Sequence, residues 1–161
     1  MEIRAAVMSD MPEILRVYAC ARRYMETSGN PSQWGKTHPP RRLLEEDIRA
    51  GRLYAGIGAD GGIRLCFALI PGDDPTYARI DGAWLNDAPY AAIHRVASDG
   101  AEKGMFEKCL AFCRERHDNL RIDTHRDNAT MQHVVEKNGF VRCGIIYLEN
   151  GDPRIAYQLA R

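Results

Sequence analysis

The sequence lacks a net charge, a long apolar run and a recognisable signal segment. Lysine plus arginine and aspartate plus glutamate each number 22 in the 161 residues. A neutral chain argues against nonspecific nucleic-acid binding, which needs a basic surface or stripe. No apolar run approaches the length of a membrane span, and the opening residues MEIRAAVMSD do not form a basic-then-apolar leader. We therefore expect a cytoplasmic protein that binds neither nucleic acid nor a membrane.

The five cysteines give no sign of a disulfide framework, because their number is odd and they are scattered along the chain. Cys109, Cys113 and His117 fall four residues apart, on one stripe of a predicted helix. Zinc usually draws its ligands from a turn and a second element, and no Cys-x-x-Cys pair is present. We expect no metal site and interpret Cys109 and Cys113 as small apolar core residues.

Length and patterning predict one α/β domain over residues 1–161. Apolar residues make up 45% of the chain, and no internal repeat or change of composition marks a linker. Helices alternate with strands only in the C-terminal half, which predicts a mixed, twisted sheet of about six or seven strands with helices on both faces, parallel in its middle and antiparallel at its ends. The expected helices span 10–26, 41–50, 105–116 and 128–138, and the expected strands span 2–5, 53–57, 63–70, 91–98, 120–124, 140–148 and 154–159, with a short extended piece at 77–81.

One strand–turn–helix unit, residues 91–116, carries a candidate phosphate site. An apolar strand leads into the turn signal Asp99-Gly100, and the helix that follows has apolar residues spaced for one buried face. The free N–H groups of a first helical turn at such a junction can bind phosphate. Most such units only connect elements, however, so Gly100 and Gly104 alone leave the function open.

A second segment carries a family resemblance. Residues 128–140, NATMQHVVEKNGF, resemble the Asn…Lys-x-Gly-Phe helix and turn of the GNAT superfamily of N-acetyltransferases, which use acetyl-CoA. Residues 91–106 are similar to the family's central strand and its pyrophosphate loop, usually written Gln/Arg-x-x-Gly-x-Gly/Ala. The order of elements extends the resemblance over nearly the whole chain. It implies acetyl-CoA as co-substrate, bound by Val96, Ala97, Ser98, Ala101, Glu102, Lys103, Gly104, Met105, Phe106 and Asn128.

Three positions depart from the family pattern. Ala101 stands where Gln or Arg is usual, and Phe106 stands where a small residue lets the backbone approach the diphosphate. Phe106 could instead turn into the core and leave the N–H groups available. Val135 stands where Tyr commonly serves as general acid, and losing a positioned acid typically lowers the rate by roughly 10²–10⁴-fold. A thiol pKa of about 8.5 still makes the CoA thiolate a fair leaving group.

The resemblance implies direct attack of an amine on the thioester, with a backbone N–H near Val96 facing the oxyanion. By alternation Tyr90, Ala92, His94 and Val96 share one strand face, so His94 is the first candidate base, the alternative being a hydrogen-bonded structural histidine. His125 is the second candidate, and Tyr147 could replace the absent acid.

The acceptor is expected to be an amine of a small molecule or a peptide. Trp34, in the Gly29–Pro40 loop, either anchors that loop on the core or lines the acceptor pocket, and Trp84 is a second candidate for the pocket wall. The departures in the loop and at Val135 keep an alternative open, a catalytically weak or inactive CoA-binding regulatory protein. A homodimer is compatible with either function.

Overall fold

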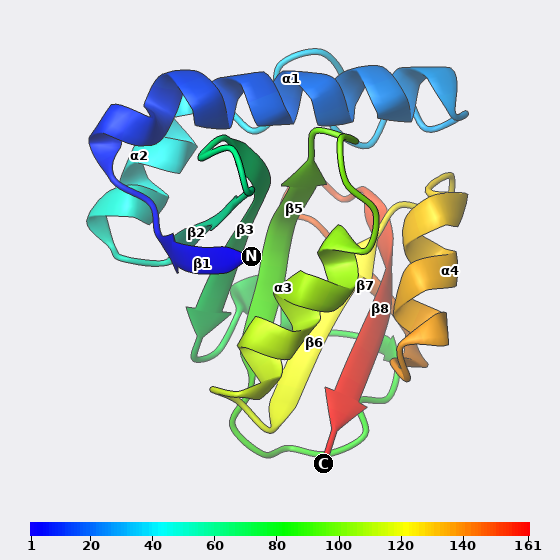
Figure 1. The fold of residues 1–161 in the computed structure, drawn as a ribbon. Coiled ribbons are helices and arrows are strands. Elements are labelled where there is room, and N and C mark those ends of the chain that lie inside the picture. The colour runs from blue at the N-terminus through cyan, green and yellow to red at the C-terminus, as the bar shows by residue number, and fades with distance from the viewer.

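The computed structural model describes residues 1–161 and shows an eight-stranded sheet with helices on both faces (Figure 1). The strand order is β1-β2-β3-β5-β6-β8-β7-β4. The strands are β1 (Glu2–Ala5), β2 (Leu53–Ile57), β3 (Ile63–Pro71), β4 (Asp81–Gly82), β5 (Ala91–Ser98), β6 (Asn119–Thr124), β7 (Val141–Tyr147) and β8 (Pro153–Ala160). The helices are α1 (Met11–Thr27), α2 (Arg41–Arg49), α3 (Met105–Arg114) and α4 (Ala129–Lys137). None of these helices combines the length and the apolar character that a membrane span requires.

The α/β class and the mixed sheet are confirmed, with two corrections. The sheet has eight strands rather than six or seven, because the two-residue β4 pairs with β7. The extended piece expected at 77–81 is present only at Asp81, where β4 begins, since Pro75–Tyr77 forms a 3₁₀ turn. Asp74 caps this turn by accepting a hydrogen bond from the N–H of Thr76. The ring of Pro75 fixes its φ at a value that suits the first position of the turn.

Strands β5 and β6 form the only parallel pair in the sheet, and they pair at one end only. The register joins Ala91 to Leu120 and Ala92 to Arg121, and no later residues are paired. Strand β5 nevertheless continues to Ser98 and β6 to Thr124. The sheet is therefore split at the C-terminal ends of these two strands.

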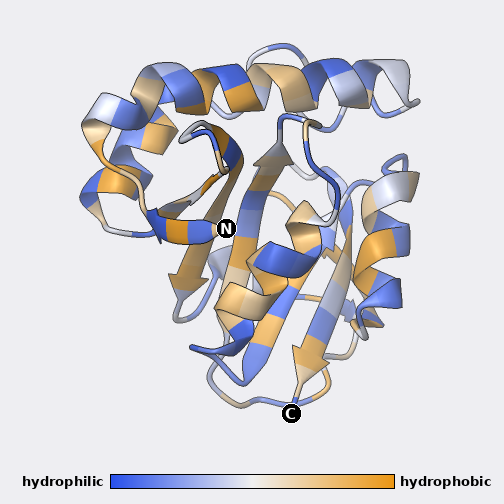
Figure 2. Cartoon of the chain, viewed as in Figure 1, coloured by the Kyte–Doolittle hydropathy of each residue, from blue (hydrophilic) through white to orange (hydrophobic).

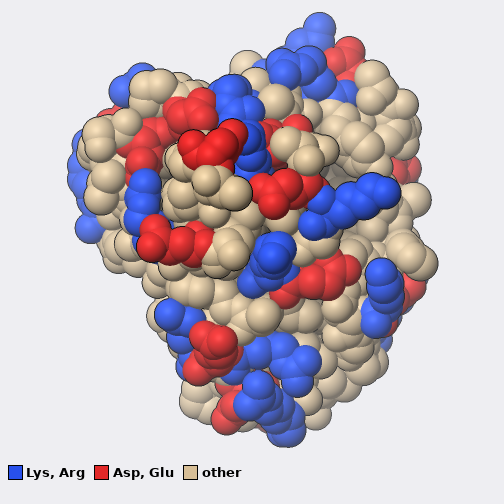
Figure 3. All heavy atoms as spheres, in the orientation of Figure 1, with Lys and Arg blue, Asp and Glu red and all other residues tan.

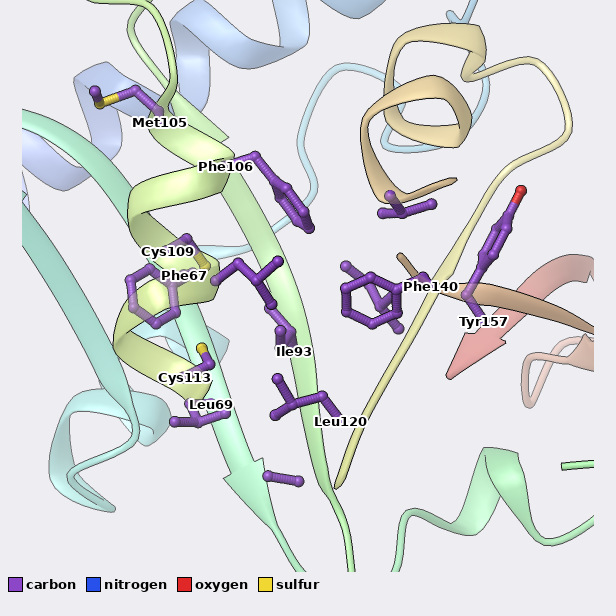
Figure 4. Packing of buried hydrophobic residues seen from close by; sticks show 14 of the residues in the cluster. Phe67, Leu69, Ile93, Met105, Phe106, Cys109, Cys113, Leu120, Phe140 and Tyr157 are labelled. Carbon is purple, nitrogen blue, oxygen red and sulfur yellow. The ribbon is translucent and has the colours of Figure 1, made fainter. Parts of the chain in front are cut away.

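Two apolar cores hold the helices on the sheet. Helices α3 and α4 lie in front of it in Figure 1, and a core that includes Phe67, Ile93 and Phe140 fills the space between (Figure 4). Cys109 and Cys113 are fully buried there, as predicted. On the other face α1 and α2 pack through Tyr18, Leu44 and their neighbours. Hydrophobic and hydrophilic residues alternate around α1 and α3, the pattern of amphipathic helices (Figure 2). Acidic and basic side chains are interspersed over the face shown in Figure 3.

A bulge at Arg95 divides β5 into two parts. Arg95 has a φ of 55°, a left-handed conformation that costs a residue with a side chain about 1–3 kcal/mol. The β3–β5 register slips here: Ala68 faces His94 and Cys66 faces Ala97, so Arg95 and Val96 have no partner on β3. As a result, Val96 packs against the α3–α4 core, while His94 stacks near Tyr77 on the opposite face. The prediction that Val96 shares the face of His94 is therefore wrong.

Buried polar contacts hold this bulge. The hydroxyl of Tyr18 donates to the carbonyl of Arg95 at 2.7 Å. The Arg95 guanidinium donates two hydrogen bonds, of 2.8 and 3.0 Å, to the carboxylate of Asp47, which is fully buried. Arg52 donates to the same carboxylate at 2.7 Å. The favourable energy of these contacts offsets the cost of the strained backbone.

We predict that Asp47→Ala lowers the free energy of unfolding by about 3–5 kcal/mol, because it leaves the Arg95 guanidinium buried without its counter-ion. Urea unfolding measures the change. Glu46→Ala is the matched control on the same helix, and its loss should stay within about 1 kcal/mol because its ion pair with Arg42 is exposed. Equal losses for the two variants would contradict this account of the bulge.

Candidate active site

Two cavities meet where β5 and β6 separate. The larger has a volume of about 710 Å³ and the smaller about 510 Å³. Both are lined by Met25, Val96, Asn128 and Met131. Val96 follows the bulge, and Asn128 caps α4 by accepting a hydrogen bond from the N–H of Met131 at 3.0 Å. The split in the sheet thus connects a cleft on its α3–α4 face with a pocket on its other face.

The smaller cavity lies at the end of β5 and the start of α3. Helix α3 begins at Met105 after Gly104, which has a φ of 77°, and no side chain caps it. The first-turn N–H groups are therefore free to bind an anion. A Cβ atom built on Gly100 or Gly104 would meet no atom within 4 Å, so the backbone of this loop stands in open space.

Asp99 fixes the conformation of the loop before α3. Its carboxylate accepts hydrogen bonds from the N–H of Ala101 at 3.0 Å, from Arg64 at 2.8 Å and from Arg16 at 3.2 Å. Burial would raise the pKa of Asp99, but these three donors outweigh it and lower the pKa. The two guanidinium groups also compensate the negative charge of Asp99, which would otherwise repel an anion at the start of α3.

The larger cavity contains a histidine held between two carboxylates. His94 Nε2 lies 2.7 Å from Oδ2 of Asp74, and Nδ1 lies 3.9 Å from Oδ2 of Asp123. Tyr77 donates its hydroxyl proton to the same Asp123 oxygen at 2.6 Å. Because a carboxylate only accepts, the short contact places the proton on Nε2 and leaves Nδ1 of the neutral ring as an acceptor.

Asp74 is ionised in the folded protein. Burial would raise its pKa, but hydrogen bonds from His94 and Thr76 outweigh burial and lower the pKa to about 2, below the ordinary value of 3.8. The sequence analysis did not select Asp74. The sequence around Asp74 reads Asp-Pro-Thr, which is typical of a capped turn. That pattern does not indicate which side chain the carboxylate contacts.

Comparison with solved structures decides the family. A GNAT-family acetyltransferase from Streptococcus agalactiae is 31% identical and superimposes with a TM-score of 0.87, over 99% of this chain and 95% of that one. The chain belongs to the GNAT family of acetyltransferases. No protein-family model and no curated protein sequence matches it.

More distant structures share the GNAT fold with this protein. A GNAT-family acetyltransferase from Listeria monocytogenes is 18% identical, with a TM-score of 0.69 over 98% of this chain and 92% of that one. A ribosomal-protein-alanine N-acetyltransferase from Brucella melitensis is 17% identical, with a TM-score of 0.63 over the full length of both chains. At these identities the likeness concerns the fold alone.

In this GNAT protein the unusual Phe106 lines the smaller cavity and at the same time packs into the core. The ring is buried beside Phe140, with 6.3 Å between ring centroids, as the sequence analysis anticipated (Figure 4). Most residues selected for the cofactor line the smaller cavity, but Ala101 and Lys103 do not. Val135 is fully buried in the α3–α4 core, so the position that commonly holds the acid has no proton donor.

Of the other residues predicted for the site, one lines a cavity and three do not. Trp34 packs on Tyr18, with 5.7 Å between ring centroids, and also lines the larger cavity. His125, Tyr147 and Trp84 line neither cavity.

Each of these three side chains has another contact. His125 Nδ1 accepts a hydrogen bond from the N–H of Asp127 at 3.0 Å, and burial lowers its pKa. Tyr147 donates to Asp81 at 2.6 Å, and Trp84 stacks on Arg121. The structure therefore brings His94 and Trp34 to the site and leaves His125, Tyr147 and Trp84 outside it.

We predict that Asp74→Asn destabilises the protein near neutral pH, and that the difference from the wild type shrinks as pH falls from about 4 to about 2. A pKa lowered on folding contributes stability above the unfolded-state pKa and loses it as pH falls toward the folded-state value. Urea unfolding at several pH values measures the difference. Asp73→Asn, at the exposed neighbouring residue, is the control. A pH-independent difference for Asp74→Asn would contradict the lowered pKa of Asp74.

Proposed function

We propose that the protein transfers an acetyl group from acetyl-CoA to the nitrogen of an amine. The observation that carries this proposal is the junction of the two cavities at Val96 and Asn128. On one side of the junction lies the uncapped start of α3, and on the other side lies the His94–Asp74 pair. Membership of an acetyltransferase family supports the reaction class.

The smaller cavity suits CoA. The first-turn N–H groups of α3 and the open backbone at Gly100 and Gly104 suit a diphosphate, whose charge the helix N-terminus favours. Val96 offers an apolar wall to the pantetheine arm at the point where the cavities join. When bound, acetyl-CoA supplies an activated acyl group whose carbonyl carbon is open to nucleophilic attack.

In the proposed reaction His94 accepts a proton from the amine through Nδ1, and Asp74 keeps the ring oriented through Nε2. The amine nitrogen attacks the thioester carbonyl, a C–N bond forms and the C–S bond breaks, and the electron pair leaves with sulfur. Arg95 and Val96 have no partner in the β3–β5 register, so their backbone can turn toward the oxyanion. An ionised Asp74 also stabilises the imidazolium that forms.

The departing thiol has no evident acid in this chain. Val135 is buried in the core and Tyr147 lies outside both cavities. We therefore propose that CoA leaves as the thiolate, which a thiol pKa of about 8.5 allows near neutral pH. A CoA-binding protein without catalysis has no observation in its favour beyond these departures, and it would not explain the histidine between two carboxylates.

The proposal is tested by a thermal-shift titration with CoA together with thiol release from acetyl-CoA across an amine panel. We expect the melting temperature to rise with CoA concentration and thiol release to depend on the amine. Stabilisation without turnover on any amine would support the non-catalytic alternative. No stabilisation and no turnover would reject both functions.

We predict that His94→Gln lowers kcat by roughly 10²–10⁴-fold, because it removes the proton acceptor that faces the cavity. The thermal shift with CoA should be retained, since His94 does not line the smaller cavity. His133→Gln is the matched control, on the exposed side of α4, and should leave kcat within about twofold of the wild type. Unchanged turnover of His94→Gln across pH would remove His94 as the base.

A further inference from the structure

Arg154 on β8 is a buried cation without a counter-ion. The residue is only 7% exposed and lines the larger cavity. No carboxylate lies within 4.0 Å of its guanidinium, whose one hydrogen bond goes to the carbonyl of Pro153 at 2.9 Å. Isolated buried charges are costly, so buried guanidinium groups are normally paired. A partner from outside the chain would supply what Arg154 lacks.

Half-buried Arg95 and buried Arg121 show what is missing at Arg154. Arg95 is bound by the carboxylate of Asp47 through two hydrogen bonds. Arg121 lies 3.9 Å from the ring centroids of both Trp84 and Tyr90, which provide cation–π contacts. Arg154 has neither an acidic partner nor an aromatic one. Burial lowers its pKa, against the more distant charges of Asp123 and Asp152.

The sheet register places Arg154 on the same face of the sheet as the proposed base. Asp123 faces Ala156 across the β6–β8 pair, and Arg154 follows on the same face by alternation. On the other side of β6, His94 Nδ1 lies 3.9 Å from Asp123. Base, carboxylate and free guanidinium therefore stand on three adjacent strands. All three side chains line the larger cavity.

We propose that the acceptor is a small amine that also carries a carboxylate, bound with its carboxylate on Arg154 and its amine beside His94 and Asp123. This inference rests on the proposed function. The planar fork of a guanidinium matches a carboxylate with two parallel hydrogen bonds. The Asp123 carboxylate attracts the ammonium form, and Nδ1 of His94 can take its proton.

The same charges disfavour other amines. A polyamine or a simple alkylamine would bring more positive charge beside Arg154 and leave the guanidinium unpaired. The larger cavity is lined by three arginines, Arg52, Arg95 and Arg154, and by three aspartates, Asp74, Asp123 and Asp152. Because its lining carries both signs of charge, the cavity suits an acceptor that carries a carboxylate as well as an amine.

The test uses amines matched in everything but the carboxylate. Thiol release from acetyl-CoA is measured for phenylalanine and phenylethylamine, tyrosine and tyramine, and lysine and cadaverine, with the amino-acid amides alongside. In at least one pair we expect the amino acid to have a kcat/KM higher by roughly 10- to 100-fold, the value of hydrogen bonds to a charged group. The amide keeps the shape of the amino acid but not its negative charge, so its kcat/KM should be close to that of the decarboxylated amine.

Variants of Arg154 assign the preference to this side chain. Arg154→Gln should raise KM for the amino acid and abolish its advantage over the decarboxylated amine. Arg154→Lys should restore part of the advantage, because it keeps the charge but not the fork. Arg142→Gln, at an exposed arginine of the neighbouring β7, is the control. Thermal unfolding shows whether each variant is folded. The matched amines, assayed with the wild-type protein, show whether a carboxylate is preferred even if every variant fails to fold.

The outcomes separate this inference from the proposed function. Equal kcat/KM within every pair, a preference for the decarboxylated amines, or turnover of peptides alone overturns the inference and leaves acetyl transfer intact. No thiol release with any amine rejects acetyl transfer. Calorimetric titration of the CoA-loaded protein with the amino acids then decides the inference: binding that Arg154→Gln abolishes supports it, and absence of binding overturns it.

Discussion

The partial pairing of β5 with β6 is the constraint on which the rest of the structure depends. Two parallel strands joined only at Ala91–Leu120 and Ala92–Arg121 leave their backbones apart beyond that point. Helices α3 and α4 cover one side of the resulting opening, and the Trp34 loop borders the other. Because the opening is made by the backbone, both cavities and their junction follow from the topology of the sheet rather than from any one side chain.

The bulge at Arg95 determines which side chains of β5 face each side of this opening. It turns Val96 toward the α3–α4 face and keeps His94 on the opposite face, so this one strand lines both cavities. The bulge depends in turn on Tyr18 of α1 and Asp47 of α2. Helices that lie outside the proposed chemistry thus determine the geometry within it. Substitution of Asp47 should therefore lower both stability and activity, whereas substitution of His94 should lower activity alone.

Local patterns predicted the elements well and the site only in part. The strands 53–57 and 91–98, the helix from Arg41 and the Asn128 cap all follow from short-range signals and agree with the structure. The face of Val96 could not be predicted, because the bulge is held by residues far away in the sequence. The same applies to Asp74 and Arg154, whose roles depend on what lies across the sheet. Trp84 and Tyr147 were chosen for their chemistry, and the fold directs both to contacts outside the cavities.

We propose that the cofactor enters the opening between β5 and β6 at the start of α3. Hydrogen–deuterium exchange with and without CoA tests it most directly. We expect CoA to slow exchange of the amides in 96–107 and 128–134, the segments that contribute lining to the smaller cavity, and to leave β1, β2 and β7 unchanged. Protection confined to other segments, with 96–107 unchanged under saturating CoA, would contradict it.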